Sequence, residues 1–147
     1  MMSSMRRFIP GLLAACLLAA PARASAEPVA WNQERVAAIA SELAQALERL
    51  KASAERDAEQ PSVVQERRRQ GVLADLRRLG SLSADLAARL KAGQGWRETS
   101  GIYQEIQTVR RQAREAGREL LTPDSTAADI VAARGMLERL APYYESR

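Results

Sequence analysis

The stretch RVAAIASELAQALERLKASA, residues 35–54, decides the fold. Apolar residues recur at steps of four, three, four, three and four, and form one stripe: Val36, Ala40, Leu43, Leu47, Leu50 and Ala54. A mean spacing of about 3.5 residues is typical of helices that pack side by side with a left-handed crossing. The stretch therefore predicts a helix with one face buried against other helices.

The same spacing recurs in three later segments, separated by breaks that contain Pro or Gly. The stripes run over 72–90, 102–120 and 126–144, and the breaks lie at Pro61, 93–95 and 122–124. No window of the chain after residue 26 alternates with the period of two that marks a strand. The sequence predicts an all-α protein, an antiparallel up-down-up-down four-helix bundle with helices at about 33–57, 62–92, 100–121 and 126–144.

One polar residue interrupts the stripe of the second expected helix. Ser83 falls in a middle layer of the bundle together with Leu43, Val109 and Leu137. A lone serine inside a helix usually bonds to a carbonyl one turn earlier, here near Leu79. A nucleophilic serine would need a base beside it, so we expect a structural role.

The first 26 residues have the features of a secretory signal. Arg6 and Arg7 precede an apolar run over 8–20, and small residues lead to Ala24 and Ala26. The run is too short to cross a bilayer as a stable anchor. The sequence predicts cleavage after Ala26, a periplasmic or secreted location, and a single domain over 27–147.

Cys16 gives the same segment a second interpretation. The sequence from Leu13 to Cys16, Leu-Ala-Ala-Cys, resembles the lipobox of bacterial lipoproteins. That resemblance implies acylation of Cys16 and an envelope lipoprotein held at the membrane. The apolar run continues to Ala20 and an Ala-x-Ala exit follows, which favours cleavage over lipidation.

Composition excludes several classes of function. Removal of Arg6, Arg7 and Arg23 from 22 basic residues leaves 19 against 18 acidic ones, a net charge of +1. Nucleic-acid binders carry a clear basic excess, so no nucleic-acid partner is expected. Cys16 is the only cysteine and the chain has no histidine. The usual ligands of zinc, copper and haem iron, and the commonest general base, are therefore missing. We expect no metal, no cofactor and no catalytic residues.

The aromatic residues form the most informative group. After signal removal five remain, and an antiparallel bundle would bring them to one end, here named the aromatic pole: Trp31, Trp96, Tyr103, Tyr143 and Tyr144. Tyr and Trp are favoured in contact surfaces because they combine apolar area with hydrogen bonding. The alternative is a plug of large side chains that closes an Ala-rich bundle. Trp96, which we expect in a Gly-flanked loop, favours a contact surface most.

Basic residues cluster along the second and third expected helices, at 67–69, 77–78, and Arg110, Arg111, Arg114 and Arg118. An anionic partner is one interpretation. The other is a solvated face balanced by nearby acids, because Arg111 and Glu115 are four residues apart on one helix.

Residues Leu121-Thr122-Pro123-Asp124-Ser125 resemble the Leu-Thr-x-x-Gln element of periplasmic stress chaperones. The element departs at its last position, where Ser125 replaces glutamine, and a helix-capping turn is the alternative explanation. The resemblance implies a helical chaperone-like protein, and no family is assigned.

The function expected from these features is that of an exported, non-enzymatic bundle that binds a protein partner or self-associates, with the aromatic pole as contact surface. The alternative is a periplasmic carrier of a small apolar ligand, held between the helices near the Ala113 and Ala133 layer.

Overall fold

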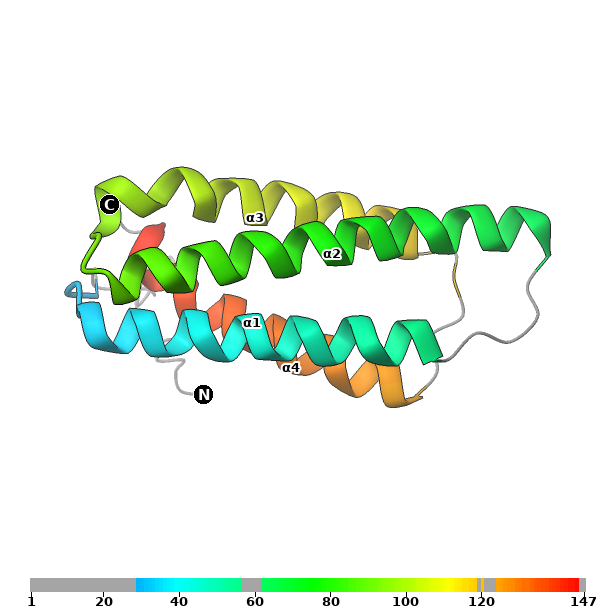
Figure 1. Cartoon of the computed structure of the whole chain (residues 1–147), viewed down its shortest axis with the longest axis horizontal. Coiled ribbons are helices and arrows are strands. Elements are labelled where there is room, and N and C mark those ends of the chain that lie inside the picture. The colour runs from blue at the N-terminus through cyan, green and yellow to red at the C-terminus, as the bar shows by residue number, and fades with distance from the viewer. Residues whose placement is uncertain (1–28, 57–61, 119, 121–123, 146–147) are drawn as a thin grey trace, which may run out of the picture.

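A computed structural model describes residues 29–56, 62–118, 120 and 124–145. The expected signal at 1–26 and Cys16 lie outside the described residues. Within them the chain forms four helices and no strand: α1 (Gln33–Arg56), α2 (Val63–Lys91), α3 (Trp96–Gly117) and α4 (Asp124–Tyr144) (Figure 1). The prediction of an all-α four-helix protein is confirmed. In the described part of the chain no helix has the length and apolar character of a membrane span.

Local sequence signals set the starts of the first two helices. The Asn32 Oδ1 atom accepts a hydrogen bond of 2.9 Å from the backbone N–H of Arg35, and so caps α1. Ser62 and Gln65 form the capping box expected from their spacing, with each side chain bonded to the backbone of the other.

The third helix begins earlier than expected, at Trp96 instead of residue 100, and ends at Gly117 instead of residue 121. Gly95 is its extended N-cap, and the carboxylate of Glu98 accepts a 3.0 Å hydrogen bond from the Gly95 N–H. This bond satisfies a backbone donor at the helix end. Trp96 is therefore the first residue of a helix, and the prediction that it lies in a loop is wrong.

The helices pack unevenly around the core. α1 packs against α2 and α4, and α2 also packs against α3, whereas α3 and α4 contact each other much less. The start of α1, the α2–α3 turn and the end of α4 lie at one end of the molecule (Figure 1). At the other end, the start of α2 projects beyond α1 (Figure 1).

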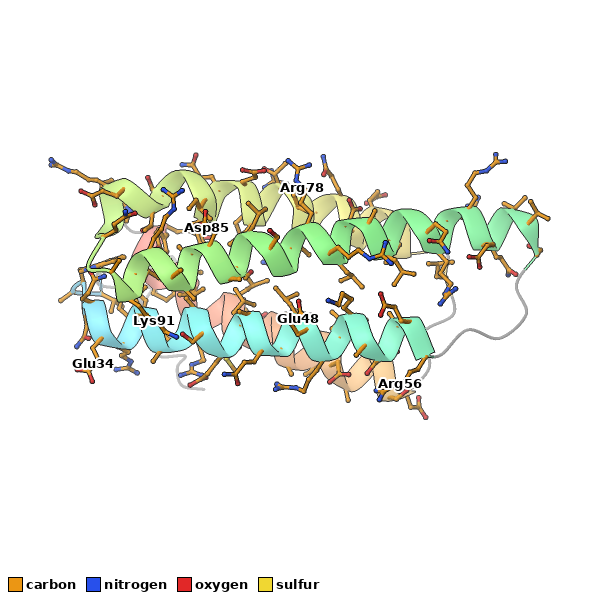
Figure 2. All side chains as sticks on the ribbon, in the orientation of Figure 1. Glu34, Glu48, Arg56, Arg78, Asp85 and Lys91 are labelled. Carbon is orange, nitrogen blue, oxygen red and sulfur yellow. The ribbon has the colours of Figure 1, made fainter. Side chains whose placement is uncertain are left out.

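The expected apolar stripes are buried in α1 and α2 except at their half-buried ends, Ala54 and Val72. Charged side chains project from the outside of the bundle (Figure 2). Leu43 and Leu86 are fully buried. The exceptions lie on α3 and α4 away from the aromatic pole. Ala116 is exposed, and Ile130 is 42% exposed although Ala133 and Leu137 beside it are buried.

Candidate functional site

Four of the five aromatic residues form a continuous row across the bundle. The Trp31 ring meets Tyr143 edge-on at 6.4 Å and Tyr144 edge-on at 5.6 Å between ring centroids. Tyr144 stacks on Tyr103 of α3 at 4.2 Å, with an angle of 7° between the rings. Trp96 is half-buried and packs against the core. The three tyrosines are buried, so Trp31 and Trp96 supply the reachable edges of the aromatic pole.

The tyrosine hydroxyls extend this row into a hydrogen-bond network. Thr99 Oγ1 donates to the Gly95 carbonyl at 2.7 Å, so Tyr144 Oη donates to Thr99 Oγ1 at 2.9 Å. Tyr103 Oη donates to a carboxylate oxygen of Glu145 at 3.0 Å and accepts from the Gln107 amide at 2.8 Å. Burial raises the pKa of both tyrosines, and the Glu145 carboxylate raises the pKa of Tyr103 further. Both hydroxyls thus stay protonated and act as donors.

Gln33 ties the start of α1 to the turn between α2 and α3. Its amide nitrogen donates to the Leu90 carbonyl at 2.7 Å and to the Gln94 carbonyl at 2.8 Å, and its amide oxygen accepts from the Trp31 indole at 2.8 Å. The turn itself is a Schellman motif around Gly93, whose φ of 89° favours glycine. Sequence analysis missed Gln33, because its partners lie far away along the chain.

Among the residues that the structure describes, three buried side-chain atoms have no hydrogen-bond partner: Ser83 Oγ, Gln94 Oε1 and Trp96 Nε1. The expected bond from Ser83 to a carbonyl one turn earlier is therefore not formed, and that prediction is wrong. Ser83 is fully buried, so its hydroxyl has lost water without gaining a partner. Gln94 lies in the turn before α3 and Trp96 begins α3, so both belong to the aromatic pole.

A second feature is the flank where α3 faces α4. At about 100° per residue, Tyr103, Gln107, Arg110 and Arg114 fall on one side of α3. Tyr103 contacts the end of α4, and Gln107 donates to Tyr103 and accepts a 3.1 Å hydrogen bond from Arg110. The contact with α4 is thus made at the Tyr103 end of this side, and Arg110 and Arg114 continue the same side along α3.

One side of α4 carries Ile130, Arg134, Leu137 and Ala141 by the same spacing. We name the residues on these two helix sides away from the aromatic pole the α3–α4 side: Arg110, Ala113, Arg114, Ile130 and Arg134. Ala113 and Ala116 offer little apolar area, and arginines line both flanks, so little holds the helices together there. This explains why Ile130 is uncovered.

The basic clusters divide into arginines that form ion pairs with carboxylates and arginines that do not. Arg69 pairs with Glu66, Arg77 with Glu55, and Arg78 with Glu105 at 2.7 Å. Figure 2 shows Arg78 on the outer surface of α2. These pairs favour the interpretation of a solvated face for the arginines of α2.

On α3, Glu115 does not neutralise the charge of Arg111 as expected. Glu115 pairs with Arg118 at 3.1 Å, so the predicted Arg111–Glu115 pair is wrong. Arg111 donates to the Thr108 hydroxyl instead. In the part of the chain that the structure describes, no carboxylate pairs with Arg110, Arg111 or Arg114.

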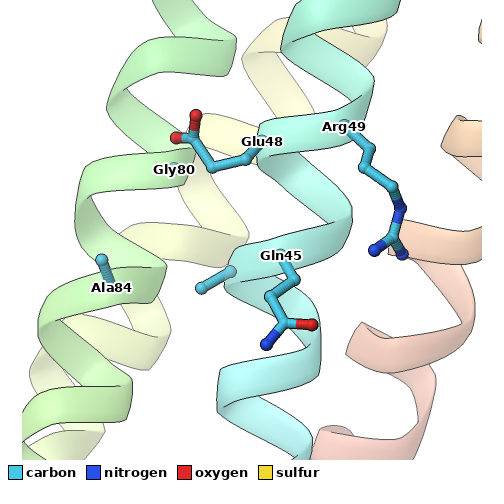
Figure 3. Close-up of a pocket in the computed structure, with 6 residues that line it drawn as sticks. Gln45, Glu48, Arg49, Gly80 and Ala84 are labelled. Atoms are coloured by element: carbon cyan, nitrogen blue, oxygen red, sulfur yellow. The ribbon is translucent and has the colours of Figure 1, made fainter.

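Two shallow hollows lie between α1 and α2. One, of about 370 Å³, is lined by Ala44, Gln45, Glu48, Arg49, Gly80 and Ala84. In it the Glu48 side chain reaches across to Gly80 (Figure 3), and a Cβ at Gly80 would lie 3.1 Å from its carboxylate. The other, of about 450 Å³, lies beside the aromatic pole at Gln33, Leu90 and Gly93. Neither includes Ala113 or Ala133, where an apolar ligand was expected.

Among residues 29–56, 62–118, 120 and 124–145, no three His, Cys, Asp or Glu side chains gather as metal ligands do. Comparison of the chain with protein-family models, curated protein sequences and solved structures gave no match. The case for function therefore depends on the aromatic pole and the α3–α4 side.

Proposed function

We propose that this protein is exported, that loss of residues 1–26 leaves an antiparallel up-down-up-down bundle, and that this bundle acts by binding a partner protein. The basic head, short apolar run and Ala-x-Ala exit support export. The positions of the helix ends in Figure 1 support the topology.

The observation that carries the binding function is the exposure of Ile130. It stands in the apolar stripe of α4, between the positions of Thr126 and Ala133, which are buried. Because this residue belongs to the apolar stripe and its own neighbour helix leaves it uncovered, its exposure supports contact with another chain. The aromatic pole then works as a clamp that holds α3 to α4, and the half-buried Trp31 and Trp96 extend the contact surface.

The native mass of the protein purified from its own envelope tests this function. We expect a complex with another polypeptide, and an intact mass that begins at Glu27. A bare monomer would contradict the binding function. A monomer with a small apolar molecule would favour the carrier alternative, and a mass that begins at an acylated Cys16 would favour the envelope lipoprotein.

A further inference from the structure

We infer that the partner presents an acidic amphipathic helix, and that this helix docks along the α3–α4 side as a fifth helix. The inference rests on the proposed function, that the bundle binds a protein. It specifies the chemistry of the partner from the charges and apolar residues of the two flanks.

The charges of the α3–α4 side call for acidic groups from outside. Arg110 and Arg114 have no carboxylate partner among the described residues, and Arg110 reaches only the Gln107 amide. On α4, Arg134 is paired with Glu138 at 2.8 Å, so that carboxylate is already engaged by a residue of its own helix. Carboxylates along the edge of a docked helix would give both free guanidiniums bidentate partners.

The apolar residues between these arginines suit a helix better than an extended chain. Ala113 is half-buried and Ile130 is 42% exposed, and each lies on a stripe that already has helical spacing. A partner helix with apolar residues at i, i+3, i+4 and i+7 would lay its face over these positions. The small side chain of Ala113 lets a helix backbone approach closely.

A second copy of this chain fits the same surface poorly. Two copies related by a two-fold axis would present the same patch to each other. Arg110 and Arg114 of one copy would then meet the arginines of the other, and like charges in an interface disfavour association. The charge pattern therefore favours a different, acidic partner.

The test uses synthetic fluorescent peptides of about 20 residues, with Leu at helical spacing and Glu on both flanks. A scrambled peptide of the same composition and a peptide with Lys in place of Glu are the controls. Fluorescence anisotropy with the full mature protein should show binding of the acidic amphipathic peptide only, weakened by added salt.

Two protein variants localise the site. Arg110→Glu with Arg114→Glu should weaken binding by about tenfold, as expected for the loss and reversal of two exposed charge pairs. The matched control is Arg49→Glu with Arg67→Glu, which changes two exposed arginines away from the α3–α4 side and should leave the affinity within about twofold. Circular dichroism checks that both variants are helical.

Equal binding of the scrambled or Lys peptide, equal weakening by the two double variants, or no binding at all would overturn the inference. If the peptide fails while the native mass shows a protein complex, the partner class is wrong and the proposed function stands. If the native protein is a bare monomer, the proposed function is wrong, and the inference that rests on it is wrong as well.

Discussion

The Tyr103 ring of α3 lies flat on the Tyr144 ring of α4, with centroids 4.2 Å apart and an angle of 7° between them. This contact joins two helices that otherwise touch little. Both rings are buried, so the pair acts as a clamp at the aromatic pole, while the α3–α4 side, away from the pole, has no such contact between the two helices.

Replacement of Tyr103 by Ala should lower the free energy of unfolding by about 3–5 kcal/mol, because a large buried ring and a stacked pair are lost. Tyr103→Phe keeps the ring and should cost only about 1 kcal/mol. Urea denaturation followed by circular dichroism measures both. Equal losses for the two variants would show that the hydroxyl, not the stack, holds the helices together.

Alkaline pH should destabilise the domain because the pKa values of Tyr103 and Tyr144 are raised in the folded state. Their stabilisation is fully present below the ordinary tyrosine pKa of 10.0. The folded state keeps its phenolic protons longer than the unfolded state, so the free energy of unfolding should fall as pH rises above about 10. The measurement is urea denaturation at several pH values.

In Tyr103→Phe with Tyr144→Phe this fall should be shallower, since neither ring can ionise. An identical pH dependence in the double variant and the native protein would show that other groups cause the alkaline unfolding.

Gln33→Ala should lower the free energy of unfolding by about 1–2 kcal/mol, because the Gln94 carbonyl and the Trp31 indole each lose a hydrogen bond. Amide hydrogen exchange at the α2–α3 turn should also become faster. The matched control is Gln45→Ala on the exposed surface of α1 (Figure 3), expected within about 0.5 kcal/mol. If the amide hydrogens of the α2–α3 turn exchange as slowly in Gln33→Ala as in the native protein, Gln33 does not hold this turn to α1.

Ser83→Ala should leave the free energy of unfolding unchanged or raise it by about 1 kcal/mol. The substitution removes a buried hydroxyl that has no partner, and so removes a desolvation cost. Thermal unfolding by calorimetry measures the change. A loss of more than about 1 kcal/mol would show that Ser83 Oγ makes a hydrogen bond in solution.

The apolar spacing was enough to predict the four helices and the burial of the stripes in α1 and α2. The start of α3 was missed although a local signal exists, since Glu98 follows Gly95 at capping-box spacing. The two glycines, Gly93 and Gly95, favour a loop in the sequence, whereas in the structure the Glu98 carboxylate begins the helix directly after them.

Other features depend on tertiary structure and leave no local trace. The Gln33 side chain binds backbone atoms 57 and 61 residues away along the chain. The pattern of residues within α1 does not predict contacts at that separation. The exposure of Ile130 depends on the distance between α3 and α4. The apolar stripe of α4 alone does not predict that distance. The aromatic residues were expected at one pole, but only packing shows that the tyrosines are interior and the tryptophans are at the edge.

The central claim is that the α3–α4 side contacts another protein, and photo-cross-linking in the native envelope tests it most directly. A photoreactive amino acid would replace Ile130 on this side, and Val64 would be the control because it is an exposed apolar residue on α2. The account predicts one discrete adduct with another polypeptide from position 130, none from position 64, and loss of the adduct with Arg110→Glu and Arg114→Glu. No adduct from position 130, or the same adduct from both positions, would contradict it.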